Sequence, residues 1–361
     1  MKIAIALGTR PEIIKMSPVI RELEKRRQDY FVLHTGQHYS YNLDRVFFEE
    51  LKLPQAKYNL EVGSGSHAQQ TASILIGVEK VLQDDTPDVL LVEGDTNSVL
   101  GSALAATKLH IKVGHVEAGL RSYDRNMPEE INRILTDHCS DYLFAPTPKA
   151  RQILLGEGIP EEKIFVTGNT IVDAVFQNLE IAKGNSSSEL RTLNLEPKNY
   201  FLVTLHRQEN VDNPRRLASI LEGLDKLAAE FRVPIVYPVH PHSLKKMKEF
   251  GLNPQKITLI EPVSFLDFLN LESNARLILT DSGGVQEEAC ILGVPCVTLR
   301  DNTERPETLE VGSNVLAGTL PGNILRCAQL MLHRENKWSN PFGDGRAGER
   351  IVKIIMEAKH G

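Results

Sequence analysis

The sequence predicts an α/β protein with two doubly wound parallel sheets. Three observations support this prediction. Short apolar runs alternate with stretches of helical periodicity from the first residues onward, which is typical of a parallel sheet with helices on both faces. The alternation is interrupted by a polar run at residues 183–189 and then begins again. The length of 361 residues also exceeds what a single hydrophobic core usually supports.

The first half opens with an apolar run at residues 2–7, and Pro11 follows where it can begin a helix. Apolar residues then recur at helical spacing as far as Leu23. Further segments of both kinds follow: strands are predicted at residues 30–34, 88–95, 112–116, 141–145 and 163–167, and helices at about 67–82, 100–109 and 128–140.

The second half repeats this pattern after a helix that begins at Ile171. We interpret the polar run as a loop near a domain boundary. We therefore predict Rossmann-like domains at residues 1–170 and 171–345, with a last helix at about 346–361 packed on the first domain. Ligands of open parallel sheets bind outside the carboxyl ends of the strands, so two such halves facing each other would form a cleft. The strands of the second half are predicted at residues 200–205, 235–240, 256–260, 276–280 and 295–299.

Composition limits the partners of the chain. The formal net charge is -6, without a block of like charge, which argues against nucleic acid or an anionic membrane as the main partner. No apolar run approaches the roughly 18 residues of a membrane span, and the first residues form a strand rather than a signal peptide, so we predict a cytoplasmic protein. Scattered cysteines are expected to be buried thiols: Cys139, Cys290, Cys296 and Cys327.

One stretch, residues 277–299, has the pattern of a strand, a glycine turn, a helix and a strand. The N–H groups near Ser282, Gly283 and Gly284 can face an anion, aided by the helix dipole, so we expect a phosphate there. Glu287 and Glu288 follow on the same helix, where one of them can turn toward a sugar ring. A cluster of charged residues, 300–307, comes just after the next strand.

Charged residues also gather at the predicted strand ends, and each has a structural explanation when taken alone. Asp95 could cap the next helix, and Glu129 could complement the dipole of its own helix. All of these residues are expected at the same edge of the two sheets, which favours a functional role. His206 in particular could act as an acid or a phosphate partner. The strand-end residues are Arg10, Asp95, Glu117, His206, His240 and Asp281.

Two motifs are rejected as cofactor or metal sites. Residues 63–68 fit a G-x-G-x-x-A pattern but do not close the first strand, so no nicotinamide cofactor is predicted. His240 and His242 flank a proline without a third ligand nearby, so no metal site is predicted.

Motifs along almost the whole chain resemble those of the non-hydrolysing UDP-N-acetylglucosamine 2-epimerases, and they occur in the same order. They are Gly8-Thr-Arg-Pro-Glu-Ile-Ile-Lys-Met16, Glu93-Gly-Asp-Thr96, Gly114-His-Val-Glu-Ala-Gly-Leu-Arg121, Pro128-Glu-Glu-Ile-Asn-Arg133, Thr167-Gly-Asn-Thr170, Thr280-Asp-Ser-Gly-Gly-Val-Gln-Glu-Glu288, Arg300 to Glu307 and Asn340-Pro-Phe-Gly-Asp-Gly345.

The resemblance implies the two-domain fold of nucleotide-sugar glycosyltransferases (GT-B-like), a homodimer, and interconversion of UDP-GlcNAc and UDP-ManNAc for surface polysaccharide or glycan synthesis. The implied acid/base residues are Asp95, Glu117, Glu129 and His206. The resemblance also implies contacts with the nucleotide sugar, with Val263 and Phe268 near the uracil. The other implied contacts are Arg10, Lys15, Asp95, Glu117, His206, Ser282, Gly283, Gly284, Glu288 and Arg305.

Two positions depart from the pattern of many bacterial members. Those members have His where this chain has Glu93, and they carry a Gln-His motif followed by a methionine where this chain has Gln37-His-Tyr-Ser-Tyr41. That motif lines a second, regulatory UDP-GlcNAc site, for which the residues here would be Gln37, His38 and Gln70.

The chemistry of such a reaction restricts its route. The hydrogen at C2 of the sugar is not adjacent to a carbonyl, so a base cannot simply remove and return it. The remaining route is elimination of UDP, which gives 2-acetamidoglucal, followed by re-addition of UDP. A hydrolysing epimerase that releases ManNAc and UDP, a glycosyltransferase and a non-catalytic nucleotide-sugar sensor stay as alternatives.

Overall fold

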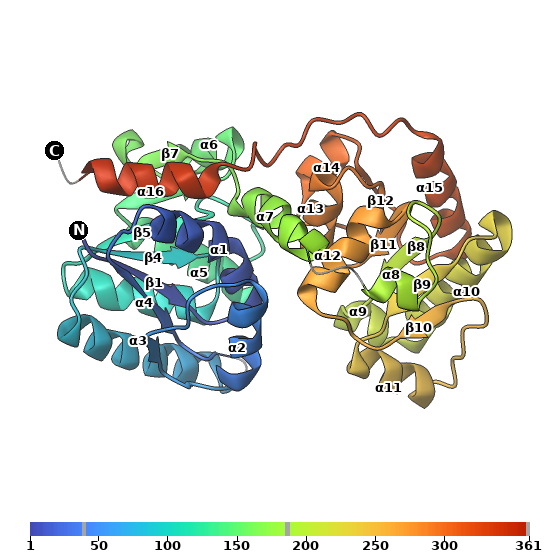
Figure 1. Cartoon of the computed structure of the whole chain (residues 1–361), viewed down its shortest axis with the longest axis horizontal. Helices are drawn as coiled ribbons and strands as arrows, with labels where there is room; N and C mark the ends of the chain where they lie inside the picture. Colours follow the sequence, from blue (N-terminus) through green and yellow to red (C-terminus); the bar gives the residue numbers. More distant parts are fainter. Residues whose placement is uncertain (38–40, 185–187, 359–361) are drawn as a thin grey trace. The chain divides into compact units, whose positions relative to one another are not determined.

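The computed structural model describes residues 1–37, 41–184 and 188–358, which form two compact units. The first unit consists of Met1–Gln177 and the segment from Phe342 onward, and the second consists of Asn178–Pro341. Figure 1 labels the elements of both units. Residues 185–187, in the polar run between the predicted halves, lie outside the described part of the chain.

The first unit contains a parallel sheet of seven strands in the order β3-β2-β1-β4-β5-β6-β7. The chain order reverses between β1 and β4, and this is the point where open α/β sheets bind ligands. The strands are β1 (Ile3–Leu7), β2 (Tyr30–His34), β3 (Tyr58–Asn59), β4 (Val89–Glu93), β5 (Lys112–Val116), β6 (Tyr142–Ala145) and β7 (Ile164–Val166).

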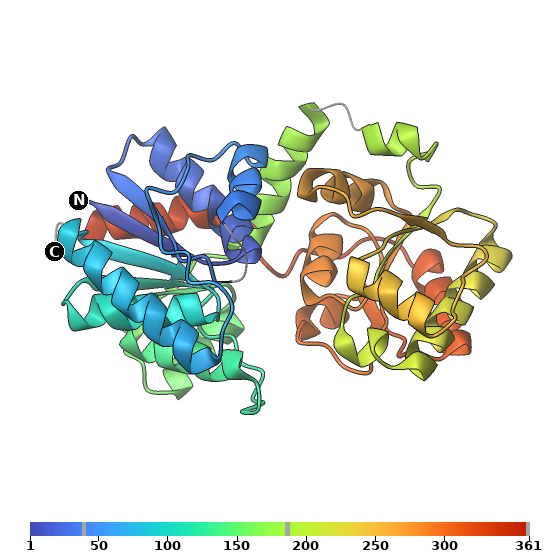
Figure 2. The ribbon, with the colours of Figure 1, turned by 90° about the horizontal axis from the view of Figure 1, so that it is seen from below.

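Helices cover both faces of this sheet (Figures 1 and 2). The last helix, α16, packs against α1, and the carboxylate of Asp173 accepts the N–H groups of Ala347 and Gly348 at its first turn, at 3.1 and 3.0 Å. The helices are α1 (Arg10–Lys25), α2 (Tyr41–Glu50), α3 (His67–Asp84), α4 (Asn97–Lys108), α5 (Pro128–Cys139), α6 (Pro148–Gly156), the 3-10 helix η1 (Glu161–Lys163), α7 (Thr170–Gly184), which continues past this unit, and α16 (Ala347–Glu357).

The second unit contains a parallel sheet of six strands in the order β10-β9-β8-β11-β12-β13. Its order reverses between β8 and β11. The strands are β8 (Phe201–Thr204), β9 (Ile235–Pro238), β10 (Thr258–Ile260), β11 (Leu277–Thr280), β12 (Cys296–Thr298) and β13 (Asn314–Leu316); the helices are α8 (Ser188–Thr192), α9 (Gln208–Val211), α10 (Pro214–Phe231), α11 (Pro241–Glu249), α12 (Phe265–Asn274), α13 (Gly283–Ile291), α14 (Pro306–Glu310) and α15 (Pro321–His333).

The continuous apolar runs follow from burial of both sheet faces. In β8 the side chains of Phe201 and Val203 join one hydrophobic core, whereas that of Leu202 joins another. Alternate side chains of a strand point to opposite faces, so a strand covered on both sides must be apolar at every position. The predicted α/β class with two doubly wound parallel sheets is therefore confirmed. Within the described residues, no helix is long and apolar enough to cross a membrane.

Candidate active site

Each sheet brings charged side chains to its switch point. In the first unit, Arg10 follows β1, Asp95 follows β4 and Glu117 follows β5. In the second unit, His206 follows β8 and Asp281 follows β11. These strands are neighbours within their own sheets, so the sequence prediction that these residues gather at strand ends agrees with the topology.

Lys15 is the centre of a carboxylate cluster in the first unit. Its Nζ atom lies 2.5 Å from Oε2 of Glu117 and 3.2 Å from Oε1 of Glu93. The amide of Asn169 also donates to Oε2 of Glu117, at 3.2 Å. Glu117 has a φ of 69°, a left-handed conformation that is uncommon for a residue with a side chain and is often found at functional sites. Its carboxylate is therefore held from several directions.

Two further carboxyl groups of this cluster are almost completely buried. Glu12 accepts the N–H of Gly8 at 2.5 Å and the hydroxyl of Thr96 at 2.6 Å, yet burial raises its pKa to about 7. Burial also raises the pKa of Glu93, and the charges of Glu117 and Glu12 add to this effect against the opposing charge of Lys15. Charged carboxyl groups here therefore exceed the cations that could compensate them.

Asp95 does not cap the helix that follows it. The N-cap of α4 is Thr96, whose hydroxyl accepts the N–H of Val99 at 3.4 Å. Asp95 instead forms an ion pair with Arg133 of α5, and the amide of Asn132 donates to its backbone carbonyl at 2.9 Å. The structural explanation available from the sequence is therefore wrong, and the Asp95 carboxylate is held by a cation.

The two glutamates that open α5 have different environments. Glu130 is buried and accepts the N–H groups of Ser122 and Tyr123, both at 2.9 Å, while Arg133 lies 2.9 Å away. These bonds hold the loop that enters α5. Glu129, the predicted acid/base residue, is half-buried in the same helical turn, and its role stays a prediction.

The remaining predicted residues of the first unit differ in exposure. Arg10 is exposed at the start of α1, and its guanidinium lies 4.7 Å from the centre of the Phe47 ring. The side chains of Gln37 and Gln70 are buried: Gln37 accepts the N–H of Ser98 at 2.9 Å, and Gln70 donates to the carbonyl of Gln37 at 2.9 Å. His38, the third residue of the predicted regulatory site, lies outside the described residues.

In the second unit, Asp281 orients His206. The Asp281 side chain is completely buried, and it accepts the N–H groups of His206 and Arg207, both at 3.1 Å. Burial alone would raise the pKa of Asp281, but these bonds and the imidazole of His206 outweigh it and lower that pKa. Nδ1 of His206 lies 3.2 Å from Oδ1 of Asp281 and the imidazole is half-exposed, so Nε2 is the nitrogen that remains for a ligand.

The predicted anion seat opens α13. Ser282 is the N-cap, Gly283 is buried and Gly284 is exposed. A Cβ atom on Gly283 would lie 2.8 Å from Oε1 of Glu304, so glycine permits the close approach of this carboxylate.

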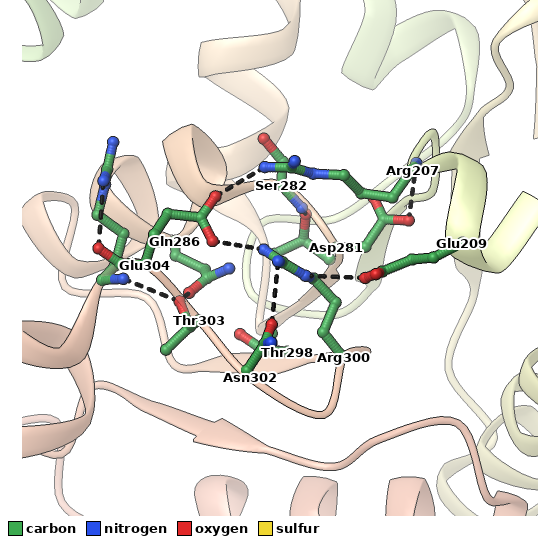
Figure 3. A network of polar contacts seen from close by, with 12 residues as sticks. Arg207, Glu209, Asp281, Ser282, Gln286, Thr298, Arg300, Asn302, Thr303 and Glu304 are labelled. Atoms are coloured by element: carbon green, nitrogen blue, oxygen red, sulfur yellow. Dashed lines mark hydrogen bonds and ion pairs between the residues drawn. The ribbon is translucent and has the colours of Figure 1, made fainter. Parts of the chain in front are cut away.

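Glu304 lies between two arginines that Figure 3 shows on either side of it. Arg207 contacts Oε1 at 2.7 Å and Arg300 contacts Oε2 at 2.6 Å. Burial alone would raise the pKa of Glu304, but Arg300 lowers it to about 2. Arg300 also contacts Glu209, at 3.1 Å. The sequence indicates a charged cluster at residues 300–307 but not the contact with Arg207, which lies 97 residues from Glu304 in the sequence.

The other predicted residues of this unit surround α13. Arg305 lies 2.9 Å from Oε1 of Glu287, so Glu287 has a cationic partner, and Glu288 on the same helix is almost completely buried. Val263 and Phe268 pack on the hydrophobic core beside α13. Over the described ranges 1–37, 41–184 and 188–358, no cluster of three or more His, Cys, Asp or Glu side chains could hold a metal ion.

The fold defines an α/β protein of two doubly wound units, each with charged groups at the switch point of its parallel sheet. A family model described as UDP-N-acetylglucosamine 2-epimerase matches residues 21–356, and the chain belongs to this family.

Similar proteins span the whole chain. A UDP-N-acetylglucosamine 2-epimerase of Methanocaldococcus jannaschii is 57% identical over 367 residues and covers 100% of both chains. A crystal structure of the UDP-GlcNAc 2-epimerase of that organism, in complex with UDP-GlcNAc and UDP, has a TM-score of 0.87 and 58% identity over 99% of this chain and 100% of that one. A UDP-2,3-diacetamido-2,3-dideoxy-D-glucuronate 2-epimerase of Pseudomonas aeruginosa is 40% identical over 99% of this chain and 100% of its own.

Proposed function

We propose that this chain interconverts UDP-GlcNAc and UDP-ManNAc without releasing free sugar. Membership of the UDP-N-acetylglucosamine 2-epimerase family supports the substrate class. The observation that carries the mechanism is the placement of two carboxylates, Asp95 and Glu117, beside neighbouring strand ends, each with a cationic partner. Such groups can take a proton from C2 as UDP leaves and give a proton to C2 as UDP adds back.

The reaction has two halves in this proposal. A carboxylate takes the proton from C2 while the bond from C1 to UDP breaks, which yields 2-acetamidoglucal and UDP. UDP then adds back to C1 while a proton enters C2 from the opposite face. Asp95, Glu117 and Glu129 are the proposed acid/base groups of the first unit, and the proposal leaves open which of them serves which face.

The second unit holds UDP in this proposal. The diphosphate leaves as an anion, and donors that strengthen as its charge develops lower the barrier. The proposed donors are the N–H groups at the start of α13, Nε2 of His206 and the guanidinium of Arg305; Arg10 of the first unit adds a further cation. Val263 and Phe268 offer an apolar surface for the uracil.

Proton NMR of UDP-GlcNAc in D2O with the protein tests this proposal. Elimination and re-addition predict UDP-ManNAc with deuterium at C2, because the group that protonates the opposite face of C2 carries a deuteron from the solvent. UDP-ManNAc without deuterium would contradict the mechanism, and an unchanged spectrum would contradict the function.

The same incubation separates the alternatives. A hydrolysing enzyme would accumulate free ManNAc and UDP, which chromatography resolves from the nucleotide sugars. A glycosyltransferase would leave UDP-GlcNAc unchanged until an acceptor is added, and a sensor would bind it without turnover. The chain is also 40% identical to an epimerase named for UDP-2,3-diacetamido-2,3-dideoxy-D-glucuronate, so that nucleotide sugar should be tested beside UDP-GlcNAc under the same conditions. A higher kcat/KM for the uronate would assign that sugar instead.

A further inference from the structure

Glu93 is a buried carboxyl group for which the proposed mechanism has no role. It is the last residue of β4, and it is 1% exposed. Its Oε1 atom lies 3.2 Å from Nζ of Lys15, and the same ammonium lies 2.5 Å from Glu117. One cation therefore connects Glu117, whose side chain is 8% exposed, with the still less exposed carboxyl of Glu93.

The charges of this cluster do not balance when every carboxyl is ionised. The groups that face Glu93 are Lys15 and Glu12 of α1 and Glu117 after β5. Both oxygens of Glu12 already accept hydrogen bonds, from the N–H of Gly8 and the hydroxyl of Thr96, so Glu93 is the carboxyl that shares Lys15 with Glu117. Burial raises the pKa of Glu93, so this group keeps a proton to higher pH than an ordinary glutamate.

An elimination and re-addition cycle needs such a proton. The group that takes the proton from C2 ends the cycle protonated, whereas the group on the opposite face ends it deprotonated. The next turnover in the same direction requires both groups to return to their initial states. A group that stores a proton close to Glu117 can reset Glu117 once while the site is occupied, and solvent restores the store through Glu117 and Lys15 after the product has left.

We propose that Glu93 is a positioning residue that stores a proton for Glu117 and exchanges it through Lys15. In the outward transfer an N–H bond of Lys15 breaks as an O–H bond forms on Glu117, and the O–H bond of Glu93 breaks as an N–H bond forms again on Lys15. The reverse transfer refills Glu93 when Glu117 has taken a proton from the sugar. The inference rests on the proposed function and holds for whichever face of C2 Glu117 serves.

The pH profile of kcat tests the proposal with two variants. Glu93→Gln keeps a polar group beside Lys15 but cannot hold an exchangeable acid proton. We expect its kcat to fall by about 10- to 100-fold, less than the roughly 10²–10⁴-fold of a direct acid/base group, with KM near the wild-type value. The wild-type kcat should decline as rising pH ionises Glu93, and this decline should be absent from Glu93→Gln.

Glu93→Asp is the second variant, because it restores an acid on a shorter side chain. It should recover the decline of kcat with rising pH, at a lower kcat, which a purely structural role of Glu93 does not predict. Asp173→Asn is the matched control: this carboxyl is equally buried in the first unit but binds N–H groups of α16. It should lower the unfolding midpoint and leave the shape of the pH profile unchanged.

The outcomes are distinguishable. A wild-type protein that forms no UDP-ManNAc overturns the proposed function. A wild-type protein that epimerises, together with a Glu93→Gln variant of unchanged kcat and pH profile, overturns the proton store alone. Where Glu93→Gln does not fold, a Glu93→Asp variant whose kcat does not decline with rising pH overturns it as well.

Discussion

The first unit carries a buried charged cluster and the second a half-buried one, and the two have opposite character. Around Lys15, carboxyl groups outnumber cations and burial raises the pKa of Glu12 to about 7. Around Glu304, two arginines surround one carboxylate, and Arg300 overcomes the effect of burial and lowers its pKa to about 2. Burial raises the pKa at both sites, but the contact with Arg300 outweighs it at Glu304, whereas the hydrogen bonds from Gly8 and Thr96 do not outweigh it at Glu12. The first cluster suits the holding of protons and the second the holding of charge.

The largest expected effect comes from amide variants in the first cluster. Glu117→Gln and Asp95→Asn should each lower kcat by roughly 10²–10⁴-fold, because an amide cannot take a proton from C2. UDP binding, measured by calorimetry, should change little, since the proposed UDP donors lie mainly in the second unit. Equal losses of turnover and of UDP affinity would contradict the division of roles between the units.

The pH dependence of stability should also differ between the units. The folded-state pKa of Glu12, about 7, lies above its ordinary value of 4.5, so the folded protein binds more protons than the unfolded chain between these pH values. Stability of the first unit should therefore fall by roughly 3 kcal/mol as pH rises through this window. Glu304 has a lowered pKa, so its contribution is present above pH 4.5 and is lost as pH falls toward 2.

Glu12→Gln separates these effects. Glutamine can still accept the N–H of Gly8, but it does not titrate, so the fall between pH 4.5 and 7 should shrink in the variant. Hydrogen exchange of peptides from β1 and β4 measures the first unit. Fluorescence of Trp338, the single tryptophan of the chain, measures the second unit and should respond to pH as in the wild type. If hydrogen exchange depends on pH in the variant as it does in the wild type, ionisation of Glu12 is not the cause of that dependence.

A smaller effect is expected from Arg305→Ala in the second unit. Loss of this cation should weaken UDP binding by about 10- to 100-fold, the range of one to two charge-assisted hydrogen bonds. It also leaves Glu287, whose side chain is 3% exposed, without the guanidinium at 2.9 Å. Lys226→Ala is the matched control, because Lys226 forms an exposed ion pair with Glu222 in the same unit. An Arg305→Ala variant that binds UDP as tightly as this control would remove Arg305 from the site.

The sequence predicted what local patterns determine. Buried strands appeared as continuous apolar runs, and the glycine turn at Ser282 and Gly283 identified the N-terminus of α13. The short edge strands β3 and β13 were missed, because two or three residues at a sheet edge need no apolar run.

The charge partners could not be predicted in the same way. Lys15 and Glu117 are 102 residues apart, and no spacing rule connects them. Glu129 and Glu130 both lie in the first turn of α5, but only Glu130 is buried. This difference depends on how α5 packs, and the sequence does not determine that packing.

The smallest expected effects concern the helix caps after β4 and β11. Thr96 and Ser282 occupy the same place in the two units, each accepting an N–H of its own helix, at 3.4 and 3.5 Å. Removing an N-cap hydroxyl costs about 1 kcal/mol of stability. Thr96 also donates to Glu12 at 2.6 Å, whereas Ser282 lies at the proposed phosphate seat.

Thr96→Ala should therefore lower the urea midpoint more than Ser282→Ala, whereas Ser282→Ala should weaken UDP binding more than Thr96→Ala. Thr96→Ser keeps the hydroxyl and should recover most of the lost stability. The crossed result is decisive because both substitutions remove the same kind of cap, so only the surroundings of each cap can separate them. Equal effects on both measurements would mean that the two caps serve their helices alone, and that the start of α13 does not hold the diphosphate.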